Sequence, residues 1–144
     1  MRTFVGGAAL AVGLAAFAGG PALAEVLHYK VALTSAAETP PHDSKGTGTL
    51  NATYDTDTKA LEWTIDYSGL TGPAIAAHFH GPAPAGKAAP IEVGLTGDLS
   101  SPIKGSATLT DAQAKDLMDG MMYFNIHTAA NKGGEIRGQM EKTM

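Results

Sequence analysis

Residues 60–67 read ALEWTIDY, and from Leu61 onward apolar and polar side chains alternate. Successive side chains of a β-strand point to opposite faces, so this period predicts a strand with one face against a hydrophobic core. The period recurs at 26–33 and 48–54, and residues 55–58, DTDT, predict a hairpin connection to 60–67. Shorter candidate strands follow at 75–80, 91–95, 103–109, 122–128 and 135–140. About eight strands predict an all-β fold, a Greek-key β-sandwich or barrel.

One segment has a helical pattern instead. Thr110 is followed three residues later by Gln113, which is the spacing of a capping box. Residues 111–119 then place Ala114 and Leu117 on one side, and Gly120 supplies a helix stop. The sequence therefore predicts one short helix near 111–119.

The first 24 residues have the features of a secretory signal peptide. Arg2 is followed by an apolar run and by the small-residue sequence Ala-Leu-Ala at 22–24. We therefore expect residues 1–24 to be removed and residues 25–144 to form a single domain that is periplasmic or secreted. Without Arg2 the chain carries 9 basic and 14 acidic residues. This acidic balance argues against binding to nucleic acid and against membrane insertion after signal removal.

The histidines are the candidate chemical groups. The chain has no cysteine, which excludes disulfides and thiolate metal sites. In residues 77–80, AHFH, the strand period places His78 and His80 on one face and Phe79 on the other. In residues 122–127 it places His127 on the face away from the core, together with Tyr123 and Asn125. Three imidazoles from neighbouring strands would suffice to bind copper or zinc.

A structural interpretation stands beside this one. His80 precedes Gly81 and would then only fix a turn, and His127 would only orient the following loop. Glu135 and Arg137, which alternate on the last strand, are interpreted as a cross-strand ion pair.

Several stretches of the chain resemble the CHRD domain family, a module of chordin and of exported microbial proteins. The matching stretches are LTSAAETPP (33–41), LEWTIDYSGL (61–70), AHFHGPA (77–83), YFNIHT (123–128) and GGEIRGQ (133–139). The resemblance implies a β-sandwich that is immunoglobulin-like or superoxide-dismutase-like, and it identifies His78, His80 and His127 as motif residues. It does not imply a settled activity.

A more distant resemblance is to the copper-zinc superoxide dismutases, which use a similar pair of histidines on one strand. Residues 81–90 contain no histidine or aspartate that would make a zinc subsite. Three functions therefore remain open, in this order of preference. The first is a non-catalytic copper- or zinc-binding protein, the second is a structural or protein-interaction module without metal, and the third is a copper-dependent oxidoreductase. The expected partners are a metal ion and, through an edge strand, another protein or a second copy of the chain.

Overall fold

The computed structural model describes residues 19–144. Residues 1–18, most of the expected signal peptide, lie outside the described part of the chain, and residues 19–24 are exposed and have no secondary structure. The strands are β1 (Val26–Thr34), β2 (Thr47–Asp55), β3 (Ala60–Ser68), β4 (Ala74–His80), β5 (Ile91–Gly94), β6 (Ile103–Thr108), β7 (Tyr123–Thr128) and β8 (Ile136–Gln139). A short 3₁₀ helix, η1 (Ser35–Ala37), follows β1, and the helix α1 (Asp111–Met118) follows β6. The predicted all-β fold with eight strands and one short helix is confirmed.

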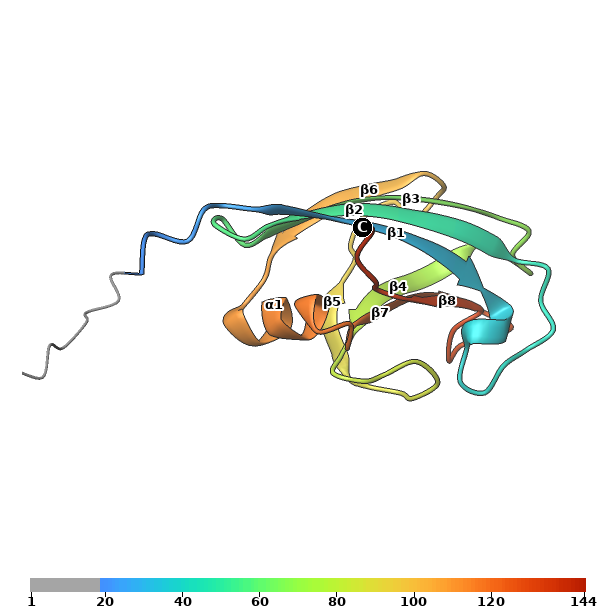
Figure 1. Cartoon of the computed structure of the whole chain (residues 1–144). Helices are drawn as coiled ribbons and strands as arrows, with labels where there is room; N and C mark the ends of the chain where they lie inside the picture. The colour runs from blue at the N-terminus through green and yellow to red at the C-terminus, as the bar shows by residue number, and fades with distance from the viewer. Residues whose placement is uncertain (1–18) are drawn as a thin grey trace, which may run out of the picture.

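The eight strands form one antiparallel, barrel-like sheet that is nearly closed. Its order is β5-β4-β7-β8-β1-β2-β3-β6, so β5 and β6 are its two edges. Figure 1 shows β1, β2, β3 and β6 as one layer and β4, β5, β7 and β8 as a second layer beneath it. The layers are joined where β1 meets β8, at the register pair Thr34↔Arg137.

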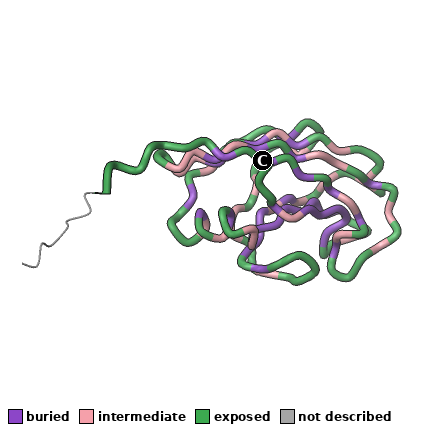
Figure 2. Tube along the Cα trace, viewed as in Figure 1, coloured by how far each residue is buried: buried purple, intermediate pink, exposed green. Residues whose placement is uncertain are grey.

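The core lies between the two layers, and its buried residues come from strands of both layers (Figure 2). Leu61, Trp63 and Ile65 of β3 are all buried, as the alternation predicts. Trp63 packs against Phe79 of β4 with 5.2 Å between ring centroids, and Phe79 packs against Phe124 of β7 at 4.9 Å. The first pair joins the two layers and the second lies within one layer, and such aromatic pairs add about 1 kcal/mol each beyond the area that they bury.

Helix α1 closes one end of the two layers (Figure 1). Both hydrogen bonds of the predicted capping box are present, since the Thr110 hydroxyl accepts from the Gln113 amide and the Gln113 side chain accepts from the Thr110 amide. Gly120 ends the helix with a φ of 72°. The Gln113 side chain also donates to the backbone carbonyl of Glu92 in β5, which ties the helix to the edge of the sheet. Within residues 19–144 no helix is long and apolar enough to span a membrane.

The interpretation of Glu135 and Arg137 as an ion pair is wrong. Both residues are buried, and each has other partners. The Glu135 carboxylate accepts hydrogen bonds from the hydroxyls of Ser44, Thr71 and Thr128 and from the backbone amide of Thr71. It therefore joins the loop before β2, the loop before β4 and the end of β7. The strand period does not reveal that loops cover the polar side of the last strand and supply these other partners.

Candidate metal centre

Strands β4 and β7 bring the three predicted histidines together. The two strands are antiparallel neighbours, with His78 opposite Asn125 and His80 opposite Tyr123. Phe79 and Phe124 point into the core, so the histidines lie on the opposite side of the sheet, as the strand period predicts. This side is nevertheless largely covered, and His80 and His127 are each only 8% exposed.

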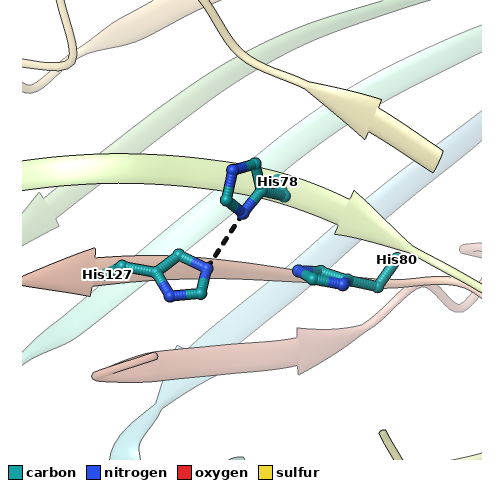
Figure 3. A group of neighbouring side chains, drawn as sticks. All are labelled: His78, His80 and His127. Atoms are coloured by element: carbon teal, nitrogen blue, oxygen red, sulfur yellow. Dashed lines mark hydrogen bonds between the residues drawn. The ribbon is translucent and has the colours of Figure 1, made fainter. Parts of the chain in front are cut away.

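The three imidazoles form a compact group (Figure 3). One ring nitrogen from each of His78, His80 and His127 lies within 4.8 Å of the others. His78 Nδ1 and His127 Nε2 are 3.0 Å apart and share a hydrogen bond. The ring centroids of His78 and His80 are 5.4 Å apart, and those of His80 and His127 are 6.2 Å apart.

The second nitrogens of two rings are held by backbone carbonyls. His80 Nδ1 lies 2.9 Å from the oxygen of Ala89, and His127 Nδ1 lies 2.8 Å from the oxygen of Lys132. A carbonyl only accepts, so each Nδ1 carries the proton, and the Nε2 lone pair of a neutral ring points into the group. Metal-binding histidines in proteins commonly use this arrangement, in which an outer carbonyl fixes the tautomer.

The surroundings keep two of the imidazoles neutral. Burial lowers the pKa of His78 below its ordinary value, and the neighbouring His127 and His80 lower it further. Burial also lowers the pKa of His80, outweighing its hydrogen bonds to Ala89 and Asn125, and the charges of His127 and Arg137 act in the same direction. A metal ion binds only the neutral form of imidazole, so these shifts favour ligation at neutral pH.

The aromatic ring of Tyr123 packs against one side of the histidine group. His80 stacks on Tyr123 with 4.8 Å between centroids and 5° between planes. The Arg137 guanidinium lies over the same tyrosine ring, 3.4 Å from its centroid, and donates to Thr39 and to the carbonyl of Lys87. Tyr123 and Arg137 therefore hold residues 81–90 and His80 in place.

The sequence prediction missed most of this support. The strand period placed Tyr123 and Asn125 beside His127, which was the available signal, but it gave no role to either side chain. It gave no signal at all for Glu38, which lies after η1 and is 5% exposed next to Gly134 and Asn125.

The two other histidines do not join the group. His28 is exposed on β1. His42 is half-buried, and its Nε2 lies 2.6 Å from the backbone oxygen of Gly134, so it connects the loop before β2 to the loop before β8.

A comparison with models of protein families gives one match to the chain. The model of the CHRD domain matches residues 29–140, which include all three histidines. No curated protein and no solved structure was found to match the chain.

Proposed function

The chain belongs to the CHRD domain family, and from this premise we propose that it is an exported, non-catalytic protein that binds one copper or zinc ion through His78, His80 and His127. The observation that carries the proposal is the group of three imidazole nitrogens within 4.8 Å of one another. Among the residues that the structure describes, these three histidines are the one group of three or more histidine, aspartate or glutamate side chains close enough to share an ion.

The separations suit a metal ion after a small adjustment. Nitrogen ligands lie about 2.0–2.1 Å from copper or zinc, which puts two donors on one tetrahedral ion about 3.3 Å apart. The His78–His127 pair, at 3.0 Å, already meets this requirement. The widest separation, 4.8 Å, must shrink by about 1.5 Å, which a small rotation of an imidazole side chain supplies.

The tautomers support the same assignment. His80 and His127 would each bind through Nε2 while Nδ1–H stays bonded to a carbonyl. His78 would bind through Nδ1, so its proton moves to Nε2 and its hydrogen bond to His127 is replaced by the shared ion. His78, the least buried of the three, lies on the side from which an ion would enter.

Titration calorimetry of the metal-free protein with Cu(II) and Zn(II) tests the proposal. We expect tight one-to-one binding that is lost in His78→Ala and in His127→Ala. His28→Ala is the matched control, because His28 lies on an exposed strand face outside the group. A parent protein that binds neither ion, or variants that bind as the parent does, would refute the assignment.

A structural module without metal is the second candidate. It is favoured by the hydrogen bonds that His80 and His127 make to Ala89 and Lys132, which connect two loops to the sheet without any ion. If the protein has this function, metal leaves the thermal unfolding curve unchanged, and His80→Ala and His127→Ala each lower the unfolding temperature of the metal-free protein.

Export is part of the proposal and has its own test. We propose that residues 1–24 are a signal peptide and that the protein is periplasmic or secreted. Mass spectrometry of protein recovered from the periplasm or medium should give a chain that starts at Glu25. Recovery of the full-length chain from the cytoplasm alone would contradict it.

A further inference from the structure

We propose that the side-chain oxygen of Asn125 is a fourth donor to the metal ion, an inference that rests on the proposed metal binding. Asn125 is directly opposite His78 in the β4–β7 pairing. It also lies between Tyr123 and His127 on the same side of β7. Side chains directly opposite each other have Cβ atoms about 5 Å apart, so the Asn125 side chain lies beside that of His78. Asn125 is 2% exposed, and a buried amide needs partners for both its oxygen and its nitrogen.

The partners of the amide nitrogen fix which way the amide points. Asn125 Nδ2 donates weakly to the carbonyl oxygen of Gly133, at 3.5 Å, and interacts with the carboxylate of Glu38. Both partners accept hydrogen bonds, so turning the amide over would set oxygen against oxygen. The Asn125 oxygen therefore faces the histidines, where it lies 3.1 Å from His80 Nε2.

This orientation leaves His80 with one proton too few. Its Nδ1 faces the oxygen of Ala89 and its Nε2 faces the oxygen of Asn125, and both are acceptors. A neutral imidazole has a single N–H, so one of the two contacts brings lone pairs together. A metal ion removes this conflict, because Nδ1–H keeps its bond to Ala89 while Nε2 and the amide oxygen both bind the cation.

The donor separations agree with a shared ion. Two donors on one ion are about 2.9 Å apart at a right angle and about 3.3 Å apart in a tetrahedron. The His80–Asn125 contact, at 3.1 Å, and the His78–His127 contact, at 3.0 Å, both fall in this range. The centre therefore offers three imidazole nitrogens and one amide oxygen.

Cu(II) titration and electron paramagnetic resonance (EPR) of Asn125→Leu and Asn125→Asp test the inference. In Asn125→Leu, which removes the donor and keeps the approximate shape, we expect one-to-one binding with a dissociation constant 10–100-fold above that of the parent. Water would replace the amide oxygen, so ¹⁷O-labelled water should broaden the EPR signal of this variant more than that of the parent. Asn51→Leu is the matched control, since Asn51 is an exposed asparagine on β2.

The aspartate variant separates ligation from hydrogen bonding. A carboxylate that binds the ion directly should bind Cu(II) at least as tightly as the amide does. If residue 125 only accepts a hydrogen bond from His80 Nε2, the carboxylate strengthens that bond, keeps the proton on the nitrogen and weakens metal binding. Weaker binding by Asn125→Asp would therefore overturn the inference.

The remaining outcomes distinguish a failure of this inference from a failure of the proposed metal binding on which it rests. An Asn125→Leu variant with the affinity and spectrum of the parent would overturn the role of Asn125 and leave the three-histidine centre standing. A parent that binds no Cu(II) would overturn both. Circular dichroism of the metal-free variants reports folding. Asn125→Ser also removes the amide oxygen but stays polar and sets no second carboxylate against Glu38, so it gives the same test where the leucine variant does not fold.

Discussion

Glu135→Gln should lower the stability of the protein by about 2–3 kcal/mol at pH 7. The Glu135 carboxylate is completely buried and accepts four hydrogen bonds, from Ser44, Thr128 and twice from Thr71. Burial alone would raise its pKa, but these hydrogen bonds outweigh burial and lower the pKa from 4.5 to about 2. A shift of this size corresponds to about 3 kcal/mol of preference for the charged form in the folded state. Glutamine retains some of the hydrogen bonds without the charge, which places the loss slightly below that figure.

The pH dependence of this contribution has a definite sign. A carboxyl group with a lowered pKa stabilises the folded state above its unfolded pKa and loses that effect as pH falls through its folded pKa. The contribution of Glu135 is therefore complete above about pH 4.5 and disappears between about pH 4.5 and 2. Because the glutamine variant lacks it throughout, the two proteins should converge in stability at low pH.

Urea unfolding followed by circular dichroism at pH 7, 5 and 3, with a chelator present, measures both effects. Glu62→Gln is the control, because Glu62 is exposed on β3 and should change stability by less than about 0.5 kcal/mol. The reasoning is refuted if Glu135→Gln has the stability of the parent at pH 7. It is also refuted if the difference between the two proteins does not shrink as the pH falls.

Three further predictions concern the site and the helix. Gly134→Ala should destabilise the folded protein by more than about 2 kcal/mol in chemical unfolding, because φ is 123° and the new Cβ would clash with the buried carboxylate of Glu38. Gly133→Ala is the control and should be tolerated, since no atom lies within 4 Å of its new Cβ. Equal unfolding midpoints for these two variants would contradict the geometry. Thr110→Ala should cost about 1 kcal/mol in the same assay, since it removes the hydroxyl that caps α1 by accepting from the Gln113 amide. Metal affinity, measured by calorimetry between pH 8 and 5, should stay nearly constant down to about pH 6.5 and fall below it, because the pKa values of His78 and His80 are lowered and protons compete only in acid. Constant affinity down to pH 5 would argue against imidazole ligands.

The strands could be predicted from the sequence because each follows the period of its own side chains. Leu61, Trp63 and Ile65 show it most clearly, since their alternation with polar residues is also their burial pattern. The same period put His78 and His80 on one face. Local patterns of this kind are visible in a single sequence because they depend only on neighbouring residues.

The pairing of strands and the burial of the site could not be predicted in this way. The alternation in β7 does not reveal that β4 is its neighbour, and the grouping of His127 with His78 depends on that pairing. Nor does it reveal that loops cover the polar side of β7 and β8, which leaves Arg137 only 2% exposed. Both features arise from contacts between residues far apart in the chain, and these contacts give Glu135 and Arg137 partners other than the predicted ion pair.

The separation of the histidines along the chain has a consequence for the order of folding. Strand β1 pairs with β2, and β2 pairs with β3, so these two pairings close short loops and should form early. His78 and His127 are 49 residues apart and meet only when β4 pairs with β7. The complete set of proposed metal ligands therefore does not exist until this long-range pairing is made. During refolding, the moment at which the chain first binds a metal ion tightly should mark the late pairing of β4 with β7, after the β1–β3 hairpins have formed.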